Sequence, residues 1–162
     1  MAEVGVYRGA SARLIRESDE ARPLHLFDTF SGLPETSETD TVHRLGHFKS
    51  HFKEGQFACG LENVQKYLSD LSSINFHPGL FPATGDELTD ERFSFVHIDV
   101  DIYQSSIDSL EWFYPRMLAG GIIVTHDFAS CVGPRKAFTV FFKRRPEPLI
   151  ELPGDQGMIL KV

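Results

Sequence analysis

The sequence predicts an α/β domain with a mostly parallel sheet, an antiparallel last strand and helices on both faces. Short apolar runs rich in Val, Ile and Phe alternate with segments of helical periodicity, the pattern of βαβ units. Several of these runs end in glycine or aspartate, as strands do at the ligand-binding edge of an open sheet. The Pro153-Gly154-Asp155 turn between the last two runs predicts a hairpin, which reverses the final strand.

Composition indicates one soluble domain and narrows its partners. A chain of 162 residues with 41% hydrophobic content is long enough for one well-buried domain, 1–162, and short for two. The net charge of −7, without a basic stripe, argues against nucleic acid and anionic membranes, so a small neutral or cationic ligand or a metal fits better. Cys59 and Cys131 have neither metal nor disulfide spacing, and no membrane span or signal segment is visible. We therefore expect a cytoplasmic protein in which both cysteines are small, partly buried residues.

The first two strands carry candidate ligand groups at their ends. Residues 2–11 are expected to form a strand that turns through Gly5 and Gly9 into a helix. These glycines either let the backbone approach a ligand closely or form an ordinary strand-to-helix turn. The next strand, 24–27, ends in Asp28, placed where nucleotide-binding folds put an acid on ribose hydroxyls. The alternative is that Asp28 forms a turn with residues 29–32.

Residues 32–60 form a polar insertion that we expect to be a mobile lid. His43, His47 and His51 recur every four residues, as on one face of a helix. Intervening glycines and the lack of an apolar stripe argue against a stable helix. A lid histidine titrates in the range useful for a general base. The alternative, solvated loop histidines, applies to at least two of the three.

The remaining elements follow from periodicity and from glycine and proline breaks. They are a helix from 61 with Leu61, Val64, Leu68 and Leu71 on its apolar face, a strand at 74–76, a central strand from 95, a helix with Ile107, Leu110, Tyr114 and Met117 in its stripe that ends before Ala119, a strand at 122–125, a helix at about 134–143, and strands at 149–152 and 158–162. Both helical stripes are interpreted as core packing.

The central strand is followed by two carboxylates, Asp99 and Asp101. If the extended conformation continues past Asp99, both face one side of the strand and can share a cation or polar ligand. Alternatively, Asp99 caps the next helix and Asp101 lies in its first turn, where the helix dipole favours negative charge.

Four phrases of the sequence together resemble a known family. They are Glu3-Val4-Gly5-Val6-Tyr7-Arg8-Gly9-Ala10-Ser11, Leu26-Phe27-Asp28-Thr29-Phe30-Ser31-Gly32-Leu33-Pro34, His97-Ile98-Asp99-Val100-Asp101-Ile102-Tyr103 and Gly120-Gly121-Ile122-Ile123-Val124. Over nearly the whole chain the sequence is similar to the TylF/MycF type of S-adenosylmethionine-dependent sugar O-methyltransferase. The resemblance implies a class I methyltransferase, Rossmann-like sheet with a reversed last strand. We expect the domain to lack the helical region that usually precedes the first strand in this family.

The resemblance also implies roles for individual residues. It assigns the cofactor to Glu3, Gly5, Val6, Tyr7, Gly9, Ser11, Asp28 and Asp99, with Asp28 on the ribose. Asp99, His126 and Asp127 would hold a divalent ion that chelates the hydroxyl pair of the acceptor. Asp99 is also a catalytic candidate, and His47 or His51, near Gly55-Gln56-Phe57, is the candidate base. The acceptor would be a small molecule, either a sugar or a glycosylated natural product, and a homo-oligomer stays open.

One departure from the family concerns the metal. This chain has His126-Asp127-Phe128 where the family commonly has Asp-Asp-Tyr. Because imidazole favours softer ions than Mg²⁺, both Mg²⁺ and Mn²⁺ are candidates. Two other functions stay open on the sequence: a metal-dependent glycosyltransferase that uses the Asp-x-Asp phrase, and a non-catalytic relic that still binds the cofactor.

Overall fold

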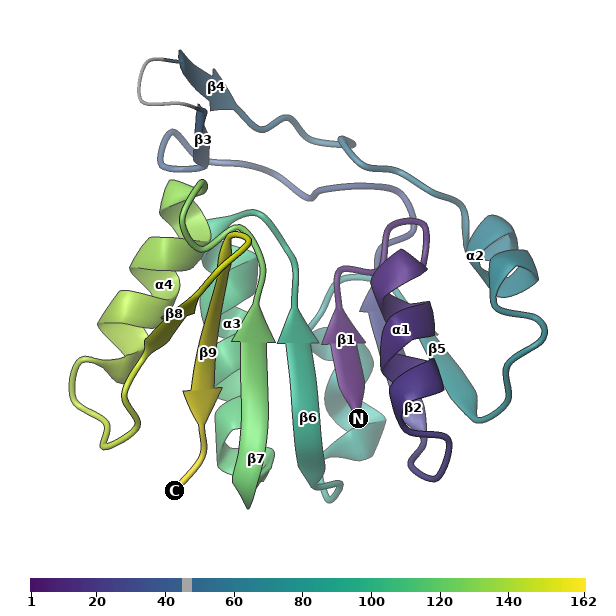
Figure 1. Ribbon diagram of the computed structural model, residues 1–162. Coiled ribbons are helices and arrows are strands. Elements are labelled where there is room, and N and C mark those ends of the chain that lie inside the picture. The colour runs from purple at the N-terminus through teal and green to yellow at the C-terminus, as the bar shows by residue number, and fades with distance from the viewer. Residues whose placement is uncertain (45–47) are drawn as a thin grey trace.

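The computed structural model describes residues 1–44 and 48–162, and the strands in these residues form a seven-stranded sheet and a separate two-stranded sheet (Figure 1). In chain order the elements are β1 (Ala2–Val4), α1 (Ala10–Ser18), β2 (Leu24–Asp28), β3 (Thr41–Arg44), β4 (Phe48–His51), α2 (Leu61–Tyr67), β5 (Ile74–Pro78), the 3-10 helix η1 (Ala83–Leu88), β6 (Phe93–Ile98), α3 (Tyr103–Phe113), the 3-10 helix η2 (Tyr114–Arg116), β7 (Met117–Thr125), α4 (Val132–Phe142), β8 (Ile150–Leu152) and β9 (Gln156–Leu160).

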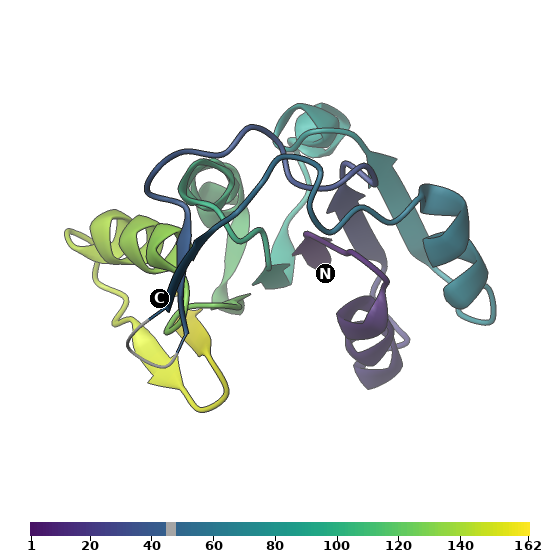
Figure 2. The ribbon, with the colours of Figure 1, turned by 90° about the horizontal axis from the view of Figure 1, so that it is seen from above.

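The large sheet has the order β5-β2-β1-β6-β7-β9-β8. The first five strands in this order are parallel, whereas β9 runs antiparallel to both β7 and β8. Helices α3 and α4 lie on one face of the sheet and α1 on the other, as the view from above shows (Figure 2). The predicted α/β sheet with a reversed last strand and helices on both faces is therefore confirmed.

Two apolar clusters hold the helices against the sheet. Alternate residues of β1 and β6 point into the cluster under α3 and α4, which includes the fully buried rings of Phe113 and Phe138. The second cluster joins α1 and α2 to the opposite face through Leu24 and Leu26 of β2. Burying one such ring or aliphatic side chain stabilises the fold by about 1.5–3 kcal/mol. This packing fixes the carboxyl ends of the parallel strands relative to one another.

The helix before β7 is shorter than the sequence predicts. It ends at Phe113, and residues 114–116 form a 3-10 turn that contains Pro115. Proline lacks an N–H donor and breaks the α-helical hydrogen-bond pattern. The expectation that Met117 belongs to the helical stripe is therefore wrong: Met117 opens β7, although it still reaches the core at 7% exposure.

The insertion contains a strand hairpin that the sequence analysis did not predict. Strands β3 and β4 pair antiparallel, with Thr41 opposite His51. The hairpin stands above the carboxyl edge of the large sheet, and the rest of the insertion runs across that edge (Figure 1). The expectation that 32–60 contains no helix is confirmed for its described residues. Strand β3 contains β-branched Thr41 and Val42, which favour extended backbone.

Candidate functional site

A cavity of about 540 Å³ opens at the carboxyl ends of β1, β2, β6 and β7. This is the edge where open α/β sheets bind ligands, and the volume suits a small molecule. Its lining combines the turn after β1, the first turn of α1, loops after β2 and β5, and the polar residues that follow β6 and β7. The lining residues thus come from the ends of several neighbouring strands and from the segments that follow them.

The turn after β1 is pressed against the next strand along the sheet. Gly5 has φ of +84°, and its N–H donates to the carbonyl of Phe27 at 2.9 Å. A Cβ at this position would lie 1.8 Å from the carbonyl oxygen of Asp99. Glycine is therefore required here because the backbone of Asp99 passes so close, and this contact also fixes Asp99 relative to the turn.

Gly9, a candidate cofactor residue, lies where the start of α1 packs against α2. It precedes α1 with φ of +84°, and an added Cβ would meet Val64 at 3.2 Å and Tyr67 at 3.3 Å. It does not line the cavity, whereas Ser11 in the first turn of α1 does. The first N–H groups of a helix have no partner within the helix, so this turn offers donors to a ligand. Gly9 itself serves the packing of α1 on α2.

Asp28 holds the turn after β1 with its carboxylate. Its Oδ2 accepts hydrogen bonds from the N–H groups of Val6 at 2.7 Å and Tyr7 at 2.9 Å. Its Oδ1 accepts the N–H of Phe30 at 2.7 Å, which closes a local turn. The interpretation of Asp28 as a turn former is thus confirmed. A carboxylate has about four acceptor positions, so one is left after these three bonds, and Asp28 lines the cavity.

Glu3 lies beneath the cavity and does not line it. Its side chain is fully buried, and its Oε1 accepts a hydrogen bond from Nδ1 of His97 at 2.8 Å. His97 does line the cavity, and its pKa is raised because the hydrogen bond and charge of Glu3 outweigh the opposing effect of burial. The other oxygen, Oε2 of Glu3, is buried without a hydrogen-bond partner among the described residues. Glu3 therefore reaches the cavity through His97.

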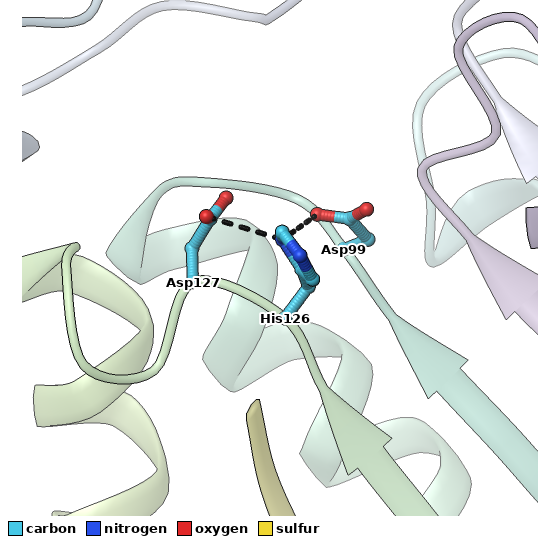
Figure 3. Close-up of side chains that lie close together, drawn as sticks. All are labelled: Asp99, His126 and Asp127. Atoms are coloured by element: carbon cyan, nitrogen blue, oxygen red, sulfur yellow. Dashed lines mark ion pairs between the residues drawn. The ribbon is translucent and has the colours of Figure 1, made fainter. Parts of the chain in front are cut away.

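Asp99, His126 and Asp127 converge on one point, as the sequence analysis expected for the metal candidates (Figure 3). Asp99 follows β6, and the other two residues follow the neighbouring strand β7. His126 lies between the carboxylates: its Nδ1 is 3.1 Å from Oδ1 of Asp127 and 3.6 Å from Oδ1 of Asp99. One potential ligand atom from each residue lies within 4.8 Å of the others.

Charge at this cluster changes the acidity of each group. The hydrogen bond with Asp127, followed by the charge of Asp99, raises the pKa of His126 to about 9. Burial raises the pKa of Asp99 to about 6, even though the histidine opposes the shift. For Asp127, burial raises the pKa but hydrogen bonds from His126 and Asp101 lower it below its ordinary value. Near neutral pH, His126 is therefore a cation held between two acids.

The donor set fits a divalent cation. Two carboxylate oxygens and one imidazole nitrogen are ordinary ligands for Mn²⁺, and the carboxylates also suit Mg²⁺. Their ligand atoms already lie within 4.8 Å of one another. An ion at this point has to compete with the proton of His126, because only a neutral ring nitrogen binds metal.

Asp101 fits neither conformation expected from the sequence. β6 ends at Ile98, and Asp101 has φ of +61°, so the strand does not continue past Asp99. Asp99 and Asp101 do not cap α3 either, because the residue before that helix is Ile102. Asp101 still lines the cavity, and burial raises the pKa of its carboxyl.

The structure brings none of the candidate lid bases into the cavity lining among its described residues. His51 is exposed at the end of β4 and does not line the cavity. His47 lies outside the described residues. His97, which the sequence analysis did not single out, lines the cavity instead. Its position two residues before Asp99, on the same side of an extended strand, was the available signal.

Sequence comparison identifies the family. The family model described as Macrocin-O-methyltransferase (TylF) matches residues 1–153. An 8-demethyl-8-(2,3-dimethoxy-alpha-L-rhamnosyl)-tetracenomycin-C 4'-O-methyltransferase of Streptomyces olivaceus is 31% identical over 139 residues, which are 80% of this chain and 52% of that protein. A demethyldecarbamoylnovobiocin O-methyltransferase of Streptomyces niveus is 26% identical over 140 residues, 81% of this chain and 53% of that protein. The chain thus spans about half the length of these relatives.

Solved structures support the fold assignment. The O-methyltransferase NovP superposes with a TM-score of 0.79 at 22% identity, covering 100% of this chain and 71% of that one. CalS11, a calicheamicin methyltransferase, gives 0.76 at 20% identity, with coverage of 99% and 71%. At these identities the similarity establishes the shared class I methyltransferase sheet. In addition, no helix among the described residues has the length and apolar character needed to cross a membrane.

Proposed function

The chain belongs to the TylF macrocin-O-methyltransferase family, and we propose that it transfers a methyl group from S-adenosylmethionine to a hydroxyl of a sugar or glycosylated natural product. One observation carries the proposal: the same cavity has the glycine turn after β1 on one side and the Asp99, His126 and Asp127 cluster on the other. Both sides lie within residues 1–153, which the family model matches. The relatives' names, which specify rhamnosyl and novobiocin acceptors, supply the acceptor class.

The side of the cavity formed by β1, β2 and α1 is suited to the cofactor. Gly5, Val6 and Tyr7 line it with backbone, and the first turn of α1 adds unpaired N–H groups through Ser11. Asp28 keeps one acceptor position for a ribose hydroxyl after binding three backbone amides. S-adenosylmethionine supplies a methyl group on a sulfonium, which an oxygen displaces in line, so this side of the cavity must fix the direction of transfer.

The side formed by the ends of β6 and β7 is suited to the acceptor hydroxyl. Asp99 faces the cavity, and a pKa of about 6 leaves it mostly ionised at neutral pH and able to accept the hydroxyl proton. Glu3 holds the orientation of His97 on the adjacent wall. Asp99, His126 and Asp127 would hold a divalent ion, which would lower the pKa of the bound hydroxyl.

Two further features belong to the same proposal. The chain 1–162 acts as one methyltransferase domain, and residues 32–60 act as a lid over the cavity. The lid runs across the carboxyl edge of the sheet, and Leu33 and Phe57 from it line the cavity. Excluding water in this way favours methyl transfer to the acceptor over hydrolysis.

Calorimetry with S-adenosylhomocysteine, followed by a transfer assay with rhamnosylated acceptors and Mg²⁺ or Mn²⁺, tests the proposal. Binding of S-adenosylhomocysteine together with methylated product is the expected result. Binding without product on any glycoside would support a non-catalytic cofactor-binding protein. Binding of a sugar nucleotide with Mn²⁺, without binding of S-adenosylhomocysteine, would contradict methyl transfer and support a glycosyltransferase.

A further inference from the structure

Asp40 is an almost fully buried carboxylate in the insertion, outside the groups assigned so far. Its exposure is 3%, although it lies in a polar segment that crosses the surface. Burying a charged side chain is costly unless its oxygens receive hydrogen bonds. The partners of this carboxylate therefore indicate why it is buried.

The two oxygens of Asp40 connect different parts of the chain. Oδ2 accepts the N–H of Ser37 at 2.8 Å and its hydroxyl at 2.7 Å, which ties Asp40 to its own loop. Oδ1 accepts the N–H of Tyr103 at 2.8 Å, across 63 positions of sequence. Tyr103 is the first residue of α3, and the residue before it, Ile102, has no side-chain group that caps a helix. Asp40 thus supplies the missing cap and places a negative charge at the helix N-terminus.

The start of α4 closes around the same carboxylate. A Cβ on Gly133 would lie 2.6 Å from the Tyr103 nitrogen and 2.9 Å from Oδ1 of Asp40. The backbone of Cys131 forms an isolated antiparallel β-bridge with Val42 of β3, and its side chain packs in an apolar cluster with Phe52 and Ile102. The insertion, the start of α3 and the start of α4 therefore meet at one densely packed point.

The two segments that meet at Asp40 also carry the acidic residues of the site. Residues 99–102 form the loop that leads into Tyr103. In this loop the Ile102 N–H donates to the Val100 carbonyl at 2.6 Å. On the other segment, the Cys131 N–H donates to the Asp127 carbonyl at 2.8 Å. Asp101 is held at φ of +61°, a conformation that a non-glycine residue keeps only where its surroundings fix it.

We propose that Asp40 is a positioning residue for methyl transfer: its buried carboxylate ties the insertion to the N-terminus of α3 and thereby fixes the loop that carries Asp99 and Asp101. The inference rests on the proposed methyltransferase function. Asp40 acts through the backbone of Tyr103 and contacts no reacting group. Without the carboxylate, the Tyr103 N–H loses its partner, and the loop before it relaxes toward ordinary backbone angles. Asp99 is held by its N–H bond to the Val4 carbonyl, so the change falls on Asp101 and on its separation from Asp127, while the turn held by Asp28 stays in place.

The central test compares Asp40→Ala with a matched control, Asp19→Ala. The Asp19 carboxylate accepts the N–H groups of Ala21 and Arg22 at 2.9 and 3.1 Å. Asp19 follows the C-terminal end of α1, whereas the cavity lies at the N-terminal end of that helix. For Asp40→Ala we expect kcat to fall at least about tenfold, because small misplacements of reacting groups cost one to two orders of magnitude. The Kd for S-adenosylhomocysteine should stay within about twofold of the wild-type value, because the residues proposed to bind the cofactor do not move in this variant. Asp19→Ala should leave kcat unchanged.

Two measurements separate positioning from general stability. Hydrogen exchange at the Tyr103 amide should accelerate in Asp40→Ala and stay slow in Asp19→Ala, and tryptic cleavage after Lys53 in the insertion should accelerate in the same pattern. Asp40→Asn, which keeps an oxygen for Tyr103, should recover much of the lost kcat. Ser37→Ala, which removes one donor to Oδ2, should give a smaller fall in kcat. Both milder variants carry the test if Asp40→Ala does not fold.

Distinct results overturn the inference or the function on which it rests. Wild-type kcat in Asp40→Ala, despite faster exchange at Tyr103, would show that the tie does not position the site. An equal loss of kcat and of S-adenosylhomocysteine affinity would show a general structural role instead. If the wild-type protein does not bind S-adenosylhomocysteine, the proposed function fails, whereas unchanged exchange at Tyr103 in Asp40→Ala refutes the tie itself.

Discussion

Asp28 and Asp99 both follow strands of the parallel sheet and both line the cavity, but their carboxylates are used in opposite ways. The carboxylate of Asp28 accepts three backbone N–H groups, from Val6, Tyr7 and Phe30. Among the described residues, the carboxylate of Asp99 accepts no backbone N–H, and its ionic partner is His126 at 3.6 Å. Burial raises the pKa of Asp99 to about 6.

Two acids at strand ends thus differ in whether the carboxylate accepts backbone amides, as in Asp28, or faces the cavity without them, as in Asp99. The backbone amides bound to Asp28 hold the turn after β1, so this side of the cavity is preorganised. Among the described residues, the oxygens of Asp99 accept no backbone donor, and burial makes the surroundings unfavourable for its charge. Variants at the two positions should therefore separate stability from activity.

The largest expected effect is on turnover in Asp99→Asn. Methyl transfer should fall about 10²- to 10³-fold, because the variant removes a charged group that faces the reacting atoms. Its melting temperature at pH 8 should stay equal or rise, since burial disfavours the charged form that is lost. Turnover and thermal melting measure the two quantities. A clear fall in melting temperature at pH 8 with turnover intact would reverse the comparison and make Asp99 the structural acid.

Asp28→Ala should show the opposite pattern, with stability as the main loss. Three N–H groups lose their acceptor, so the free energy of unfolding should fall by about 1–3 kcal/mol, or more if water does not reach them. S-adenosylhomocysteine should bind more weakly by about 1–3 kcal/mol if a ribose hydroxyl also uses this carboxylate. Urea unfolding and calorimetry distinguish the two losses. Unchanged binding in a folded variant would limit Asp28 to its turn, and unchanged unfolding would contradict the amide contacts.

His126, which follows β7, separates the two candidate ions for the cluster with Asp99 and Asp127. A chelator should abolish transfer, Mn²⁺ should restore it at least as well as Mg²⁺, and His126→Asp should shift the preference toward Mg²⁺ by about tenfold, because a third carboxylate suits the harder ion. Rates across a metal titration give the preference. If His126→Ala keeps the wild-type preference, the ring is not a ligand, and chelator-insensitive activity in Asp127→Ala would refute metal dependence altogether.

The smallest expected effect is on the pH dependence of stability. The pKa of His126 is about 9 in the folded protein, against about 6.5 for an unperturbed histidine. Because the folded value is raised, stability from the contact with Asp127 is fully present below about pH 6.5 and is lost as the pH rises through about 9. Between these values the melting temperature of the wild type should fall more than that of His126→Ala. Parallel curves for the two proteins would contradict the ion pair.

The sequence by itself determined the order of the strands and helices that build the large sheet, the reversed last strand and the strand ends that carry polar groups, but not the β3–β4 hairpin. These follow from local patterns: apolar runs, turn residues such as Pro153-Gly154-Asp155, and the rule that parallel strands share one edge. The grouping of Asp99, His126 and Asp127 was implied only by the resemblance to the family, and the structure brings the three side chains together because β6 and β7 are neighbours in the sheet. The phrases shared with the family added the expected cofactor residues at the ends of the first two strands.

Only the tertiary structure decided how each polar group is used. Asp28 accepts hydrogen bonds from amides of a turn about 20 positions earlier, and Asp40 accepts one from the first residue of α3. Gly9 packs against side chains of α2. Partners this far apart in the chain leave no local pattern in a single sequence. Hydrogen bonds and close packing depend on distances of a few tenths of an ångström, which are set only when the two apolar clusters bring the sheet and helices together.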